Sequence, residues 1–169
     1  MGGPWTEEKL DAFQKYVDAY LKIMHSTRAK HNGWPYEIIY FDGFAGSGQR
    51  ILKESVDKNK KLQFEDYLTE ETQVYEGSAE RVLKLDKKFD KYYFIDIDEG
   101  AINTLKERLS EKGLINDKCY FHCGDVNKYI KLLVSNLDKN KVALILLDPF
   151  GMQVDWKSIE IMKGKRIDL

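Results

Sequence analysis

Four short runs of apolar and aromatic residues, each reaching a carboxylate at its carboxyl end, divide the chain into regular segments. The first run is Ile38–Phe41, which Asp42 follows. Given with the residues that follow them, the other three are Tyr92–Asp98, Cys119–Asp125 and Val142–Gly151. Runs of this length are too short for helices, and continuous apolar character is typical of strands buried on both faces of a parallel sheet. We therefore expect four parallel strands.

Helical patterns alternate with these strands. Apolar residues at spacings of three and four predict an amphipathic helix over Trp5–His25, with Thr6 as its N-cap. Further helices are expected over Gly77–Phe89, Asp98–Leu109, Asn127–Leu137 and Trp156–Met162. Because strands and helices alternate, the sequence predicts an α/β protein with a three-layer, Rossmann-like fold.

Three glycines follow the first strand within a few residues. The chain reads Asp42-Gly43-Phe44-Ala45-Gly46-Ser47-Gly48, and glycine there lets the backbone take positive φ and lets a ligand come close. A loop of this kind at the carboxyl end of a strand is where open α/β sheets bind nucleotides. Its spacing fits neither the dinucleotide fingerprint nor the phosphate loop. The alternative at this point is a glycine-rich turn without a ligand.

Aspartates also end the other three strands. Asp96 stands at the tip of the second strand, where a doubly wound fold places an acid that accepts hydrogen bonds from both ribose hydroxyls. Asp125 could accept from an adenine amino group, with Val126 against the ring, or could cap the following helix. Asp148 ends the fourth strand, before a proline and an aromatic ring. Since all four strands finish at the same edge, these carboxylates predict a polar rim around a ligand cleft.

Further polar residues are secondary candidates: Trp5, Thr6, Lys9, Arg50, Arg81 and His122. The first three begin the leading helix, which could close over a cofactor but which we expect mainly to cover the sheet. The two arginines could bind an anionic substrate group, and we interpret them as solvated surface charge. The histidine could suggest a general base, but it lacks a partner and we interpret it as packed.

Composition narrows the class of protein. Of 169 residues, 43% are hydrophobic and 33% are charged, which fits one domain with a sizeable core. No apolar run reaches the length of a membrane span, and the first residues do not read as a signal sequence. The formal net charge of -1 neither supports nor excludes nucleic acid as a partner. Cys119 and Cys123 match no zinc or redox spacing, so we expect buried or half-buried thiols, no metal and a cytoplasmic location.

The loop and the strand-end aspartates resemble, in order and context, the motifs of class I S-adenosylmethionine-dependent methyltransferases, notably those that methylate amino groups. Other stretches are similar to a narrower family, the three-Cys-motif partner proteins. These stretches are Trp5–Leu10, Gly77–Ala79, Tyr93–Asp96 and Leu147–Val154. The resemblance covers nearly the whole chain, but it does not supply a substrate.

The resemblance implies S-adenosyl-L-methionine as the cofactor. The Gly46–Gly48 backbone would lie against its methionine part, Asp96 would hold the ribose, Ile97 would flank the adenine, and Asp125 would bind the adenine amino group. The complete expected cofactor set is Asp42, Gly43, Phe44, Ala45, Gly46, Ser47, Gly48, Asp96, Ile97, Asp125 and Val126.

The same resemblance places Asp148, Pro149 and Phe150 opposite the methyl acceptor as the catalytic residues. The Asp148 carboxylate and the Pro149 carbonyl could accept N–H bonds from an amino group while Phe150 stacks on a planar group. Amino-methyltransferases usually carry a second proline where Phe150 stands. The class of acceptor therefore stays open between nucleic acid, protein and small molecule.

We expect a single methyltransferase-like domain over 1–169, with an N-terminal helical segment at 1–34 and an insertion at 49–76 over the carboxyl edge of the sheet. The resemblance implies a seven-stranded sheet in the order 3-2-1-4-5-7-6, so the fold is expected to be truncated after the fourth parallel strand. Residues 167–169 resemble the start of a fifth. The fourth strand would then be an apolar edge, suited to a second chain or to self-association.

Three functions compete on this sequence. The first is an S-adenosylmethionine-dependent methyltransferase. The second is a non-catalytic methyltransferase-like module that acts through protein association, with a three-Cys-motif partner protein as the candidate partner. The third, an NAD-dependent oxidoreductase, is disfavoured by the glycine spacing.

Overall fold

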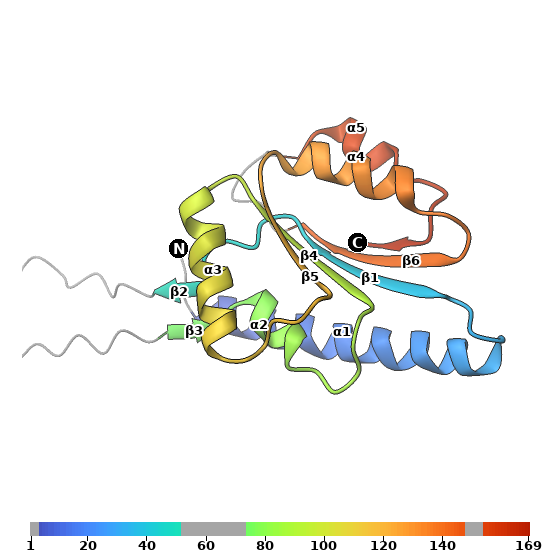
Figure 1. The fold of residues 1–169 in the computed structure, drawn as a ribbon, viewed down its shortest axis with the longest axis horizontal. Coiled ribbons are helices and arrows are strands. Elements are labelled where there is room, and N and C mark those ends of the chain that lie inside the picture. Colours follow the sequence, from blue (N-terminus) through green and yellow to red (C-terminus); the bar gives the residue numbers. More distant parts are fainter. Residues whose placement is uncertain (1–3, 52–73, 148–153) are drawn as a thin grey trace, which may run out of the picture.

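The computed structural model describes residues 4–51, 74–147 and 154–169. They contain an open, five-stranded parallel sheet with helices on both faces (Figure 1). The order across the sheet is β5-β4-β1-β6-β7, where the strands are β1 Glu37–Asp42, β4 Lys91–Asp96, β5 Cys119–Cys123, β6 Lys141–Leu146 and β7 Ile167–Asp168. Renumbered as parallel strands alone, this order is 3-2-1-4-5, so the predicted α/β class and strand order are confirmed.

The sheet is built around β1. This strand pairs with β6 from Glu37 opposite Lys141 to Asp42 opposite Leu146, and with β4 on its other side. Its side chains alternate between two separate apolar clusters, Tyr40 in one and Phe41 in the other. Both faces of β1 are therefore buried, as its unbroken apolar run predicted.

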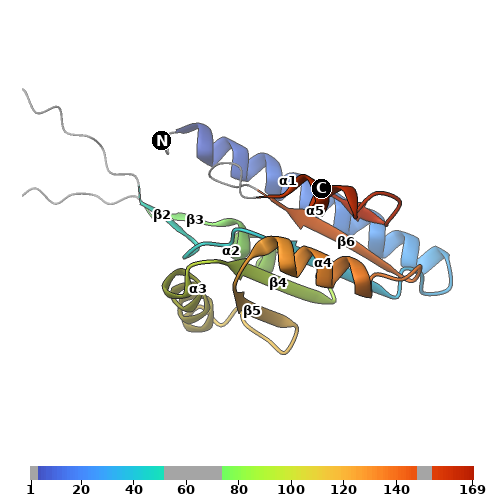
Figure 2. The same cartoon turned by 90° about the horizontal axis from the view of Figure 1, so that it is seen from above.

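Helices cover the two faces unequally (Figures 1 and 2). One face carries α1 (Pro4–Lys30), α2 (Ser78–Leu83) and α3 (Glu99–Glu111). The other carries α4 (Val126–Asn136) and α5 (Trp156–Glu160). The first helix begins before the predicted cap Thr6 and extends beyond His25, while the helix predicted over Gly77–Phe89 ends at Leu83.

Four aromatic rings form the centre of the larger cluster. One of them, Phe89, was predicted to end a helix but lies in the loop that follows α2. Its side chain is fully buried. Its ring centroid lies 5.3 Å from that of Tyr40 and 5.5 Å from that of Tyr92, and Phe94 packs 6.1 Å from Tyr40. This cluster joins β1, β4 and the loop between α2 and β4.

The predicted apolar edge at the fourth strand is wrong. The short strand β7 pairs with β6 in parallel, with Ala143 opposite Ile167 and Leu144 opposite Asp168. The residues that resembled the start of a fifth strand therefore do form one, and they cover part of the edge that was expected to be open.

The ends of the predicted insertion pair with each other. β2 (Gln49–Ile51) and β3 (Val74–Glu76) form a two-stranded antiparallel sheet directly after the Gly-rich loop. Residues 52–73 of the insertion lie outside the described residues. Within the ranges that the structure describes, the helices are all too short or too polar to span a bilayer.

Candidate functional site

The Gly-rich loop 43–48 leaves β1 at the carboxyl edge of the sheet, toward the left of Figure 1. Backbone hydrogen bonds fix it between the neighbouring strands. The Gly43 N–H donates to the Leu146 carbonyl at 3.0 Å, and the Ala45 N–H donates to the Ile95 carbonyl at 3.0 Å. The loop is thus held from β6 on one side and from β4 on the other.

Asp42 supports this loop from inside the protein. Its side chain is 1% exposed. One carboxylate oxygen accepts from the Phe44 N–H at 3.2 Å, and the other accepts from the Ser78 hydroxyl at 2.6 Å and the Tyr40 hydroxyl at 3.3 Å. The carboxylate therefore ties the loop to the start of α2, and its contribution to ligand binding would be indirect.

Burial raises the pKa of Asp42 from 3.8 to about 6, although the hydrogen bonds from Ser78, Phe44 and Tyr40 oppose the shift. Because the folded state holds this proton more tightly than the unfolded state, the group's contribution to stability is fully present below pH 3.8. It is lost as the pH rises through about 6.

We expect Asp42→Asn to remove this pH dependence. The free energy of unfolding of the wild type, relative to this variant, should fall by on the order of 2–3 kcal/mol as the pH rises from about 4 to about 7. Urea unfolding at several pH values measures the difference directly. A difference that is constant with pH, or that rises with it, would contradict the assignment.

Asp96 connects three segments at the tip of β4. Its carboxylate accepts from the Gly46 N–H at 2.8 Å and from the Asp98 N–H at 2.9 Å, and its backbone carbonyl accepts from the Gly124 N–H at 2.9 Å. Each carboxylate oxygen has more than one lone pair, so both can accept further bonds. The acid predicted to hold a ribose is thus bonded to the loop that would contact the rest of the cofactor.

A hollow of about 300 Å³ lies at the strand exits, next to Ile97, the residue that follows Asp96. It is lined by Gly43, Phe44, Ile97, Gly124, Asp125 and Val126, all of which except Gly124 belong to the predicted cofactor set. Ile97 is 74% exposed. The structure therefore brings residues from three strand exits together around one concave surface.

Asp125 lines this hollow and caps α4. Its carboxylate accepts from the Asn127 N–H at 2.9 Å and from the Asn127 side-chain amide at 3.1 Å. Asp98 caps α3 in the same way, accepting from the Ala101 N–H at 3.1 Å. The capping role considered for Asp125 is therefore confirmed, and its other proposed role stays a prediction.

The two later glycines of the loop serve different purposes. Both have positive φ, +58° at Gly46 and +70° at Gly48, which favours glycine. A Cβ at Gly48 would lie 2.5 Å from Leu105 of α3, whereas a Cβ at Gly46 would have nothing within 4 Å. Gly48 therefore permits close packing of α3, and Gly46 leaves space above the loop.

Several candidate residues cannot be placed, whereas Lys9 and His122 can. Asp148, Pro149 and Phe150 lie outside the described residues, as do the side chains of Trp5, Thr6 and Arg50. Lys9 is exposed on α1. His122 packs between the rings of Tyr93 and Tyr129, at centroid distances of 6.5 and 5.1 Å, which confirms its interpretation as a packed residue.

The interpretation of Arg81 as solvated surface charge is wrong. Only 6% of this residue is exposed, and its guanidinium forms ion pairs with Asp11 at 2.5 Å and with Glu7, both on α1. The two carboxylates on α1 compensate the positive charge of this arginine on α2, which explains why it can be buried. The prediction of buried or half-buried thiols holds for Cys119, whereas Cys123 is exposed.

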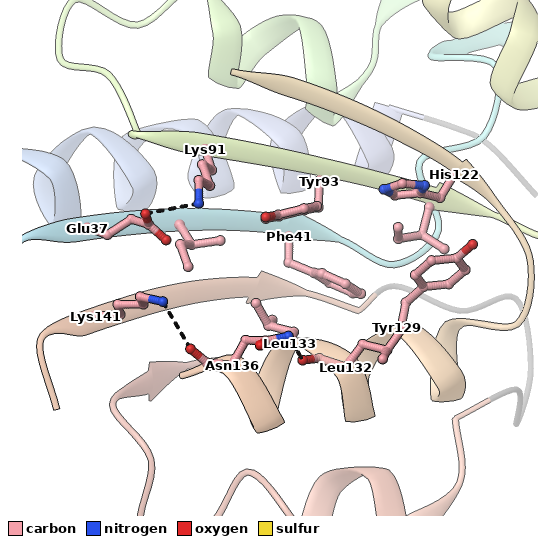
Figure 3. Close-up of a pocket in the computed structure, with 12 residues that line it drawn as sticks. Glu37, Phe41, Lys91, Tyr93, His122, Tyr129, Leu132, Leu133, Asn136 and Lys141 are labelled. Carbon is pink, nitrogen blue, oxygen red and sulfur yellow. Dashed lines mark hydrogen bonds and ion pairs between the residues drawn. The ribbon is translucent and has the colours of Figure 1, made fainter. Parts of the chain in front are cut away.

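A second hollow lies between the sheet and α4 (Figure 3). Its volume is about 370 Å³, and Ile39, Tyr93, His122 and Leu133 are among its lining residues. Its charged groups interact with nearby protein groups: Lys91 with Glu37 at 3.0 Å, and Lys141 with the Asn136 carbonyl at 3.2 Å. None of the predicted cofactor residues lines it.

Sequence reasoning missed three residues of the site. Gly124 lines the hollow, Ser78 binds Asp42, and Arg108 of α3 donates to the Ser47 carbonyl at 3.0 Å. Gly124 was recognisable as the residue between the third strand and its aspartate. The pairings of Ser78 and Arg108 depend on how helices pack against the loop, which local patterns do not report.

Comparisons with known proteins support the fold alone. Neither a scan against protein-family models nor a search of curated proteins finds a match. Among solved structures, the crystal structure of protein LPL1258 from Legionella pneumophila str. Philadelphia 1, titled as family-model DUF519, matches with a TM-score of 0.56 at 16% sequence identity. The match covers 90% of this chain and 63% of that one. The likeness shows a Rossmann-like α/β fold.

Proposed function

We propose that this protein binds S-adenosyl-L-methionine at the carboxyl edge of its sheet and transfers the methyl group to an acceptor. The observation that carries the proposal is the hollow of Gly43, Phe44, Ile97, Gly124, Asp125 and Val126 at the strand exits, together with the Asp96 carboxylate bonded to the adjoining loop at Gly46. Apolar side chains with a few convergent polar groups are what small-molecule sites require.

The residues present fit this cofactor in three respects. Ile97 and Val126 offer apolar surface for adenine, and the Asp125 carboxylate at the same rim can accept from its amino group. The Asp96 carboxylate can accept from ribose hydroxyls. Above Gly46 there is room that even a single Cβ would begin to occupy, which suits close approach of the methionine part.

The cofactor supplies a sulfonium methyl group, which is open to in-line attack by a lone pair. The protein's contribution is then mainly to hold the two reactants in line. Asp96 and Asp125 would fix the ribose and the base. We keep Asp148, Pro149 and Phe150 as the residues proposed to face the acceptor.

We also propose, from the similarity of Trp5–Leu10 and Leu147–Val154, that the chain is related to the three-Cys-motif partner proteins. Cofactor binding without detectable methyl transfer to any class of acceptor would favour the alternative, a non-catalytic partner module. Binding of NAD in place of S-adenosylmethionine would favour an oxidoreductase.

A matched pair of glycine substitutions tests the site. Gly46 and Gly113 both have positive φ, +58° and +67°, and a Cβ at either position would have nothing within 4 Å. Leucine should therefore cost each variant a similar free energy of unfolding, about 1–2 kcal/mol. Only Gly46→Leu fills the space above the loop, because Gly113 lies beyond the end of α3.

The measurement is calorimetric titration with S-adenosylhomocysteine, the demethylated product of the cofactor. We expect Gly46→Leu to weaken binding at least about 10-fold, which corresponds to about 1.4 kcal/mol, and Gly113→Leu to bind like the wild type. Equal affinities in the two variants would contradict the proposed site.

A further inference from the structure

We propose that Arg108 is a positioning residue, which aims the backbone N–H of Gly48 at the carboxylate of the ligand's amino-acid part. This inference rests on the proposed function. It assigns a role to a side chain on α3, a helix with no other proposed part in holding that end of the cofactor.

Arg108 reaches the loop from a site that holds its side chain in place. One guanidinium nitrogen donates to the Ser47 carbonyl at 3.0 Å, and another lies 3.7 Å from a carboxylate oxygen of Glu80 on α2. Glu80 is only 2% exposed and also pairs with Lys84 at 2.8 Å and Lys112 at 2.6 Å. The arginine therefore bridges a buried carboxylate and the loop backbone.

Fixing the Ser47 carbonyl also fixes the next N–H group. In a planar trans peptide the C=O of one residue and the N–H of the next point in opposite directions. With its carbonyl directed at α3, the Ser47–Gly48 peptide turns the Gly48 N–H away from that helix. Among the hydrogen bonds of the described residues, neither the Ser47 nor the Gly48 N–H has a protein acceptor.

The loop needs such a fixing contact because Gly48 supplies the N–H of this peptide. Gly48 has a φ of +70°, and a residue without a Cβ restricts the rotation of its peptide less than other residues do. The Gly48 carbonyl is held separately, since it accepts from the Gly77 N–H at 3.1 Å. Consecutive backbone N–H groups in this kind of turn form a concave site for an anion.

Arg108→Met tests the inference, with Lys112→Met as the matched control. Lys112 binds the same Glu80 carboxylate but does not contact the loop, so both variants lose one partner of Glu80 and only one loses the loop contact. Two probes separate the ends of the ligand. S-adenosylhomocysteine has the amino-acid carboxylate, and 5′-methylthioadenosine lacks it.

We expect Arg108→Met to raise the Kd of S-adenosylhomocysteine about 10-fold. Without the arginine, the Gly48 N–H is no longer held in the direction in which it would donate to the charged carboxylate of the ligand. The Kd of methylthioadenosine should stay the same, Lys112→Met should change neither, and Arg108→Lys should recover part of the loss.

Equal weakening of both probes in Arg108→Met, or no weakening of either, would overturn the positioning role while leaving the site itself in place. Failure of the wild type to bind either probe would instead overturn the proposed function, and this inference with it. The two failures are therefore distinguishable in one set of titrations.

Discussion

Asp96→Ala should weaken the binding of S-adenosylhomocysteine at least about 100-fold, the largest effect on ligand binding expected from any single substitution. The substitution removes the proposed acceptor for the ribose hydroxyls. It also removes the acceptor of the Gly46 N–H at 2.8 Å and of the Asp98 N–H at 2.9 Å. Loss of the ligand contact and loosening of the loop act in the same direction.

Two further variants, one at Asp96 and one at Asp98, separate the loss of the ligand contact from the loosening of the loop. Asp96→Asn keeps one acceptor oxygen and should lose about 10-fold in affinity. Asp98→Ala removes a carboxylate two residues away that caps α3, so it should cost about 1 kcal/mol of unfolding free energy with affinity nearly unchanged. If calorimetry shows Asp96→Ala and Asp98→Ala to be equally weak binders, Asp96 has no special role.

Phe89→Ala should lower the free energy of unfolding by about 3–5 kcal/mol, the largest effect on stability that we expect. The ring is fully buried between Tyr20, Tyr40 and Tyr92, at centroid distances of 6.2, 5.3 and 5.5 Å. Its removal leaves a cavity at the junction of α1, β1 and β4, where rigid rings from three elements limit collapse. In a chain of this size the melting temperature should fall by roughly 10 °C.

Two controls accompany this measurement. Phe89→Leu keeps most of the apolar volume and should cost clearly less than the alanine variant. Trp156→Ala truncates a ring that is 72% exposed and should change stability by no more than about 0.5 kcal/mol. Thermal unfolding that ranks the three variants in any other order would contradict the described core.

The sequence predicted the parts of this fold that depend on local patterns. Continuous apolar runs identified β1, β4, β5 and β6, and the resemblance to class I methyltransferases implied their order. The loop glycines and Asp96 were recognisable because their function depends on backbone freedom and on position at a strand tip. In the structure these residues do lie together at the carboxyl edge.

The parts that were missed depend on packing between distant segments. Asp42 and Asp96 have the same sequence context, yet Asp42 turns inward to Ser78 while Asp96 faces the loop. Arg81 resembles any surface arginine until Glu7 and Asp11 of α1 are placed against it. Arg108 reaches the loop only because Gly48 allows α3 to pack closely.

One measurement tests the central claim most directly: titration of isotope-labelled wild-type protein with S-adenosylhomocysteine, followed by amide NMR spectra. The account predicts saturable shifts centred on the loop 43–48, on Asp96–Asp98 and on Gly124–Val126, with NAD producing none of them. Shifts centred instead on Tyr93, His122 and Tyr129, in the hollow under α4, or no saturable shift at all, would contradict it.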